Sequence, residues 1–304
     1  MKIYIIGTGG VGGYLGGKLA KAGNDVTFVA RGEFYEVMKK DGLTVKTTDG
    51  NFVINPVQVI DNISKIEEPD LVIVSVKTYD TQNVAQELNK YISSKTIIIT
   101  FQNGIQNDLQ LKQYINQGNV YPGVAYIISS KEKAGVISQT GGLKRFIFGD
   151  RTKANSNELR QIEKIFKESG IDTILSDDIE AELWKKYVFI NAFSGFTALC
   201  RSDIGKIRSN DSVYDLYKRC VRESISVADK LKIILPKTIF EDVITITDNT
   251  APNSKSSLLI DIENHRKNEI ETLNGTIVNI AKEHNIDVPI NETIYFAIKL
   301  LGVQ

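Results

Sequence analysis

A glycine-rich segment near the start of the chain carries the most specific chemical signal. It fits the spacing G-x-G-x-x-G and lies between a β-branched run and a helical pattern. In that context Gly7 permits a tight turn, Gly9 lets the backbone approach a pyrophosphate, and Gly12 lets the next helix press against the sheet. The N-terminus of that helix would hold the pyrophosphate through its free N–H groups and positive dipole. The segment therefore predicts a dinucleotide site formed by Gly7, Thr8, Gly9, Gly10, Val11 and Gly12.

The end of the second predicted strand bears on which dinucleotide binds. Enzymes that use NAD usually place Asp or Glu there, on the ribose hydroxyls, whereas this chain has Arg31. A guanidinium there would pair with a 2′-phosphate, so Arg31 favours NADP(H). Two alternatives stay open, namely that Arg31 is a solvated residue beside Glu33, and that Glu33 binds the ribose.

Two polar residues follow later strands of the predicted sheet. Lys77 comes after the apolar run 70–76, and Asn103 comes after the run 95–100. Ligands bind beyond the carboxyl ends of parallel strands, so Lys77 is a candidate cofactor or substrate contact and Asn103 a candidate neighbour of the nicotinamide. A surface lysine and an ordinary Asn-Gly turn explain the two positions equally well.

Two lysines in the second half of the chain lie on a helical pattern that starts near residue 180. Lys186 shares a helix face with Ile190, while Lys185 lies near Phe189. Either lysine could face a ligand. The purely structural explanation is an i,i+4 surface pair between Glu182 and Lys186. The residues alone favour neither explanation.

A carboxylate interrupts the apolar stripe of the long helix predicted over residues 254–284. Glu269 falls on the face that carries Ile262 and Leu273, so it needs a partner or must stay neutral. That partner is either Arg266, one turn earlier, or a ligand hydroxyl, or a lysine of the other domain. The two histidines, His265 and His284, have no companion Ser, Cys or carboxylate and are read as non-catalytic.

The elements that must position these residues fall into two groups. Strand-like and helix-like segments alternate through the first half, which predicts a doubly wound α/β sheet of the Rossmann type, with a hairpin at Asp49-Gly50. From about Ile179 the strand signals stop and helical periodicity takes over. We therefore expect a dinucleotide-binding domain over residues 1–175 and an all-helical substrate-binding domain over residues 176–304.

Composition excludes several classes of protein. The 304 residues include 42% hydrophobic and 24% charged residues, which disfavours disorder and suits two domains. Lys plus Arg and Asp plus Glu both number 37, so neither nucleic acid nor a membrane surface is an expected partner. No segment is apolar enough to span a bilayer, and the start lacks a signal-peptide layout. The only cysteines, Cys200 and Cys220, read as buried reduced thiols, so we expect a cytoplasmic protein without a metal site.

Several motifs taken together resemble the ketopantoate reductase (2-dehydropantoate 2-reductase) family over nearly the whole chain. The motifs in the second half are much more specific than the glycine loop. They are Glu182-Leu183-Trp184-Lys185-Lys186, Ser256-Ser257-Leu258-Leu259-x-Asp261 and Glu269-Ile270-x-x-Leu273-Asn274-Gly275, and they join the glycine loop, Arg31, Val76-Lys77-Thr78 and Gln102-Asn103-Gly104.

The resemblance implies an NADPH enzyme of pantothenate biosynthesis with a Rossmann domain and a helical domain. It implies that Lys186 is the catalytic lysine, that Asn103, Ser257 and Glu269 bind substrate, and that Lys77 lines the cofactor site. The family often has Asn four residues after its lysine and again four residues later. This chain has Ile190 and Ser194 there, with Asn191 adjacent, and all three are expected to line the substrate site.

The expected reaction is reduction of ketopantoate to (R)-pantoate, in which Lys186 polarises the carbonyl and protonates the alkoxide. Three alternatives stay open: a reductase of another branched 2-oxoacid, a β-hydroxyacid dehydrogenase, and a non-catalytic NADP(H)-binding sensor. The expected partner is a small 2-oxoacid, and the choice between monomer and homodimer is open.

Overall fold

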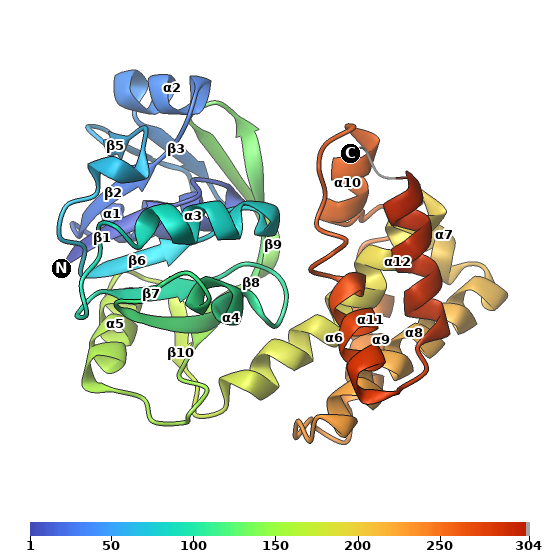
Figure 1. Cartoon of the computed structure of the whole chain (residues 1–304). Helices are drawn as coiled ribbons and strands as arrows, with labels where there is room; N and C mark the ends of the chain where they lie inside the picture. Colours follow the sequence, from blue (N-terminus) through green and yellow to red (C-terminus); the bar gives the residue numbers. More distant parts are fainter. Residues whose placement is uncertain (302–304) are drawn as a thin grey trace. The chain divides into compact units, whose positions relative to one another are not determined.

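The chain forms two compact units (Figure 1). The computed structural model describes residues 1–301. The first unit comprises Met1–Gln102 and Gln106–Ile179. The second comprises Asn103–Ile105 together with the residues from Glu180 onward. The main division thus falls after Ile179 rather than at residue 175, and a short loop from the first half of the sequence packs with the second unit.

A ten-stranded sheet forms the centre of the first unit. Its order is β4-β3-β9-β8-β7-β6-β1-β2-β5, and β10 pairs with β9. From β1 the chain builds β2 and β5 on one side and β6, β7 and β8 on the other, in parallel register. The direction of winding therefore reverses beside β1, where ligands bind in such sheets. The bounds are β1 Lys2–Ile6, β2 Asp25–Val29, β3 Leu43–Lys46, β4 Phe52–Ile54, β5 Gln58–Ile60, β6 Leu71–Val74, β7 Ile97–Thr100, β8 Asn119–Lys133, β9 Val136–Phe148 and β10 Asp172–Leu175.

Helices cover both faces of this sheet because alternate strand residues point to opposite sides. Ile3 and Ile5 of β1 belong to one core, with apolar residues of α1, α2 and α5. Tyr4 and Ile6 belong to the other core, with residues of α3 and α4. This confirms the doubly wound α/β architecture. The helices are α1 Gly10–Lys21, α2 Glu33–Asp41, α3 Thr81–Leu88, α4 Asn107–Lys112 and α5 Asn157–Glu168, with short 3₁₀ turns at Ile63–Lys65 and Thr78–Asp80.

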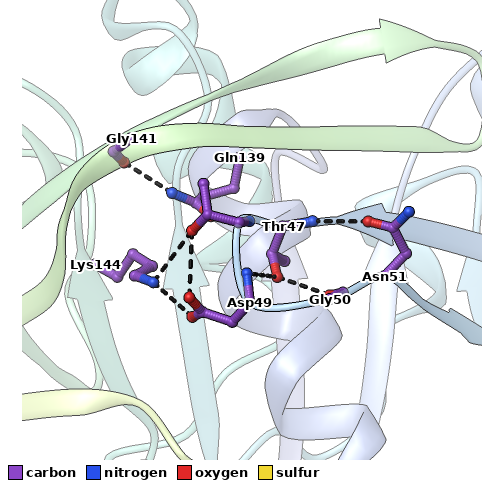
Figure 2. Close-up of polar contacts among 8 residues, drawn as sticks. Thr47, Asp49, Gly50, Asn51, Gln139, Gly141 and Lys144 are labelled. Carbon is purple, nitrogen blue, oxygen red and sulfur yellow. Dashed lines mark hydrogen bonds and ion pairs between the residues drawn. The ribbon is translucent and has the colours of Figure 1, made fainter.

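The expected hairpin at Asp49-Gly50 is confirmed by the antiparallel pairing of β3 with β4. Figure 2 shows how its turn is tied to β9. Lys144 Nζ lies 2.5 Å from Asp49 Oδ2, and the Gln139 amide accepts from Thr48 and donates to the Gly141 carbonyl. The Lys144 ammonium lowers the pKa of the Asp49 carboxyl. Because these charges are exposed, the contacts fix the geometry of the turn more than they add stability.

The second unit is helical from Glu180 to the end of the described chain. A central helix, α8, contacts α7, α9, α11 and α12. No helix within residues 1–301 has both the length and the apolarity to cross a membrane. The helices are α6 Ile179–Cys200, α7 Ile204–Arg208, α8 Asp211–Lys230, α9 Ile239–Asn249, α10 Ser257–Glu263, α11 Asn274–His284 and α12 Pro289–Leu301.

The single helix expected over residues 254–284 is wrong. α10 ends at Glu263, His265 takes a left-handed φ of 53°, and α11 begins only at Asn274. The intervening run is polar, and the Asn268 side chain accepts from the Ile270 amide, which is a local alternative to helical hydrogen bonding. Glu269 therefore lies on a loop, the 264–273 loop, and not on a helix face.

The two cysteines are both free thiols but differ in burial. Cys220 is buried on α8, as expected. Cys200 is exposed at the end of α6, which corrects the expectation that both are buried.

Candidate active site

The geometry of the glycine loop suits a dinucleotide. Gly7 has a φ of 100°, and a Cβ there would lie 2.5 Å from the Val76 amide nitrogen, so a side chain is excluded on both grounds. A Cβ at Gly12 would collide with the Ser75 hydroxyl. Gly9, by contrast, borders open space, with nothing within 4 Å of an added Cβ. The backbone is therefore accessible at the point where α1 presents its N-terminal N–H groups.

The neighbouring strands bring two further candidates to the same edge of the sheet. In β1, Ile6 pairs with Val29 of β2 and with Val74 of β6. The segments that follow these strands carry Arg31, which is exposed, and Lys77, which is partly buried. The glycine loop, Arg31 and Lys77 therefore lie at the edge of the sheet beside β1, where the direction of winding reverses. Glu33 is also exposed, at the first position of α2, so both ribose-side alternatives remain available.

The second unit separates the two lysines of α6. The Lys185 ammonium pairs with Glu182 at 2.7 Å, so Lys185 and not Lys186 makes the surface pair that the spacing suggested. Lys186 is partly buried, and its Nζ donates to Asn103 Oδ1 at 2.7 Å. Asn103 belongs to the loop that packs with this unit. Lys186 is thus the lysine whose ammonium hydrogen-bonds to a partly buried amide, that of Asn103.

Burial lowers the pKa of the Lys186 ammonium to about 8, while the nearby Glu269 carboxylate acts in the opposite direction. The two effects have simple physical causes: a desolvated cation loses hydration, and an adjacent anion favours the charged form. A lysine with a pKa close to neutral pH can donate a proton and then be protonated again. The arrangement of Lys186, Asn103 and Glu269 can therefore serve as an acid next to a hydrogen-bonding amide.

The remaining candidates on α10 and the 264–273 loop are arranged differently from the expectation. Arg266 Nε lies 3.5 Å from Asp261 Oδ1, so the ion pair of Arg266 returns to α10. The Ser256 hydroxyl caps α10 by accepting from the Leu259 amide at 3.1 Å. Ser257, the first residue of the helix, is exposed. Ser256 is thus structural, and Ser257 is the serine that a ligand could reach.

The residues after Lys186 on α6 are less accessible. Asn191 is fully buried, and its amide donates to Ser224 Oγ at 3.0 Å and to Asn291 Oδ1 at 2.6 Å. Ser194 is also buried, and Ile190 is partly buried. The structure brings Lys186, Asn103 and Glu269 together but directs Asn191 into the interior of the helical unit.

One participant was missed by reasoning from the sequence. Tyr187 is buried, and its hydroxyl donates to the Leu273 carbonyl oxygen at 2.5 Å. A tyrosine in an otherwise apolar helical stretch needs a hydrogen-bond partner when buried. That need was the available signal, although nothing in the sequence pointed to Leu273.

Comparison with known proteins finds relatives that cover nearly the whole chain. Residues 3–153 match the family described as ketopantoate reductase PanE/ApbA, and residues 178–302 match its C-terminal domain. An uncharacterized oxidoreductase, YkpB of Bacillus subtilis, is 30% identical, with 100% of each chain covered. The crystal structure of a 2-dehydropantoate 2-reductase from Geobacter metallireducens superposes with a TM-score of 0.92 at 26% identity, covering 99% of both chains. D-mandelate dehydrogenase with NADH and anilino(oxo)acetate shares the fold, with a TM-score of 0.89, 21% identity and coverage of 99% and 98%.

Proposed function

Because this chain belongs to the ketopantoate reductase family of oxidoreductases, we propose that it reduces the 2-oxo group of 2-dehydropantoate to give (R)-pantoate with NADPH. The observation that carries the proposal is the Lys186–Asn103 hydrogen bond of 2.7 Å, next to a carboxylate that acts on the same lysine. A lysine buried in this way matches the need for an acid at a reacting carbonyl.

In the proposed mechanism Lys186 acts as the general acid while negative charge develops on the carbonyl oxygen. NADPH, when bound, would supply the hydride that the ketone carbon accepts. The Lys186 ammonium hydrogen-bonds the carbonyl oxygen, and transfers a proton to it as the alkoxide forms. Asn103 orients the ammonium by accepting a hydrogen bond from it. Its interaction with Lys186 fixes one rotamer before substrate binds, which lowers the entropy lost in the transition state.

The proposed cofactor contacts come from the first unit. The open backbone at Gly9 and the start of α1 at Gly10 suit the pyrophosphate. Arg31 is proposed to pair with the 2′-phosphate, and Lys77 to line the same site, because both follow strands adjacent to β1. Asn103 remains a proposed contact of both the nicotinamide and the substrate.

The proposed substrate contacts come from the second unit. Glu269 accepts a hydrogen bond from the ketopantoate hydroxyl, and Ser257 and Asn103 bind the remaining polar groups. Asn191, expected earlier to bind substrate, is assigned instead to internal packing, since its amide is used by Ser224 and Asn291.

Another 2-oxoacid is the second candidate substrate. Ile190 and the buried Ser194 stand where the family often has asparagine, which would leave fewer polar contacts for a substrate hydroxyl. The related D-mandelate dehydrogenase binds a 2-oxoacid analogue of a different shape, together with NADH.

Oxidation of NADPH and of NADH, followed by absorbance against a panel of 2-oxoacids, tests the proposal. The highest kcat/KM is expected for ketopantoate with NADPH. A higher value for 2-oxoisovalerate would move the protein to the second candidate, and a preference for NADH would refute the cofactor assignment. A chain that oxidises neither cofactor with any 2-oxoacid would not be a reductase of this class.

A further inference from the structure

We propose that Tyr187 is a positioning residue that ties the loop carrying Glu269 to the helix carrying Lys186. The inference rests on the proposed function, because it concerns how two residues of that site are held. It assigns to Tyr187 a role that acts through Glu269, without contact with the substrate.

A short run of hydrogen bonds connects the two residues. The Tyr187 hydroxyl donates to the Leu273 carbonyl oxygen at 2.5 Å. The Leu273 amide in turn donates to the Glu269 carbonyl oxygen at 3.1 Å, and so does the Thr272 amide. The backbone of Glu269 is therefore fixed to a turn whose last carbonyl is held by a side chain of α6.

Tyr187 is itself rigid enough to act as an anchor. Its side chain is 1% exposed, and its ring packs edge-on against Trp184 with centroids 5.7 Å apart. Burial raises the pKa of its hydroxyl above the usual value for tyrosine, so the group is a neutral donor at physiological pH. A buried phenol needs hydrogen-bond partners. The Tyr187 hydroxyl donates to the Leu273 carbonyl oxygen, and Thr276 and Ile277 in the first turn of α11 also act on it.

The 264–273 loop needs such an anchor because it has no regular structure of its own. α10 ends at Glu263 and α11 starts at Asn274. A second hydrogen bond, from Asn274 Nδ2 to Asn291 Oδ1 at 3.1 Å, fixes the start of α11. The Asn274–Asn291 bond sets where α11 begins. The contact with Leu273, by contrast, is made by a residue of α6, Tyr187, which directly follows Lys186. Lys186 and Tyr187, the residue that contacts the loop, are thus consecutive on α6.

The chain offers a matched control for removing a buried phenol hydroxyl. Tyr217 on α8 is fully buried, and its hydroxyl lies 2.8 Å from Thr247 Oγ1 on α9. The two substitutions Tyr187→Phe and Tyr217→Phe remove the same atom from equally buried sites of the same unit. Only the first removes a hydrogen bond to the 264–273 loop.

The test is a double-mutant cycle in the full-length protein with Tyr187→Phe and Glu269→Ala, because alanine removes the proposed acceptor whereas glutamine could still accept through its amide oxygen. We expect Tyr187→Phe to lower kcat/KM on ketopantoate about tenfold, and to lower it by less than about twofold when Glu269 is already Ala. The loss on 2-oxoisovalerate, which lacks the hydroxyl, should be smaller. Tyr217→Phe should lower the melting temperature while leaving both kcat/KM values within about twofold. Equal effects of Tyr187→Phe in the two backgrounds, or no effect, would overturn the proposal.

A second readout does not depend on turnover of either substrate. The pKa of Lys186 can be measured from the pH dependence of its labelling by trinitrobenzenesulfonate, followed by mass spectrometry. Tyr187→Phe should lower this pKa in the direction of the Glu269→Gln value, because the carboxylate is no longer held near the ammonium. An unchanged pKa would overturn the positioning role. If the wild-type protein is inactive but Tyr187→Phe still lowers the pKa of Lys186, the proposed function is refuted and the role of Tyr187 is supported.

Discussion

Lys186 and Asn103 are separated by 83 residues in the chain, yet Nζ of the one lies 2.7 Å from Oδ1 of the other. The relationship arises because the loop Asn103–Ile105 packs with the helical unit although it directly follows the sheet. Asn103 is an uncharged acceptor, so its contact with Lys186 is a hydrogen bond that orients the ammonium of the proposed acid.

Activity should depend on pH through Lys186. Its pKa is about 8, and the protonated form is the proposed acid, so kcat/KM should fall as pH rises above about 8. The Glu269 carboxylate favours the charged lysine, so Glu269→Gln should move this decline to lower pH. The measurement is a pH profile of kcat/KM for both proteins.

A nearby carboxylate provides the control for that profile. Glu271 pairs with Lys299 at 2.8 Å and accepts from Tyr295, away from the lysine. Glu271→Gln should leave the decline where it is in the wild type. A shift of equal size in both variants would show that net charge, rather than the position of Glu269, sets the pKa.

Arg31→Ala should weaken NADPH binding and leave NADH binding nearly unchanged. Loss of a charge-assisted contact to the 2′-phosphate costs about 1.5 to 3 kcal/mol, which is roughly ten- to 150-fold in Kd. Fluorescence titration with each cofactor gives the two values. Glu33→Ala is the companion variant, and a larger loss of NADH binding there would favour the alternative in which Glu33 binds the ribose.

Glu269→Ala tests substrate identity as well as the site. The variant removes the proposed acceptor for the ketopantoate hydroxyl, at a cost of about 1 to 3 kcal/mol. The loss of kcat/KM should therefore be greater on ketopantoate than on 2-oxoisovalerate. Steady-state kinetics on both substrates decides this, since parallel losses together with a lower melting temperature would make Glu269 a structural residue.

Asn191→Ala should lower stability and leave substrate binding intact. The change removes one hydrogen bond to Ser224 Oγ and one to Asn291 Oδ1, while each of these atoms keeps one other partner, so the expected loss is about 1 to 3 kcal/mol. Thermal denaturation and KM for ketopantoate report the two properties separately. A raised KM at an unchanged melting temperature would return Asn191 to the substrate site.

The first unit could be predicted closely from the sequence because its signals are local. The glycine loop, the apolar strands and the Asp49-Gly50 turn each depend on a few consecutive residues, and the structure confirms them. The prediction of a single helix over residues 254–284 was wrong because it, too, depended on a local pattern. Its apolar periodicity spans a polar stretch in which Asn268 satisfies the backbone locally, and periodicity alone does not register that competition.

The candidate site was harder to predict because its partners are distant in sequence. Spacing offered Glu182 as the partner of Lys186 and Arg266 as the partner of Glu269. In the structure Glu182 pairs with Lys185, and Arg266 pairs with Asp261. The contacts of Lys186 with Asn103 and of Tyr187 with Leu273 depend on tertiary packing, for which no local pattern exists.

The most direct test of the account is kcat for ketopantoate reduction by Lys186→Ala, with Lys185→Ala as its matched neighbour. Loss of a positioned acid should lower kcat by about 10²- to 10⁴-fold in Lys186→Ala, with NADPH affinity unchanged. Lys185→Ala should lose little, because it removes only a partly buried i,i+3 pair with Glu182 on the helix. A larger loss in Lys185→Ala, or an undiminished kcat in Lys186→Ala, would contradict the assignment of the acid.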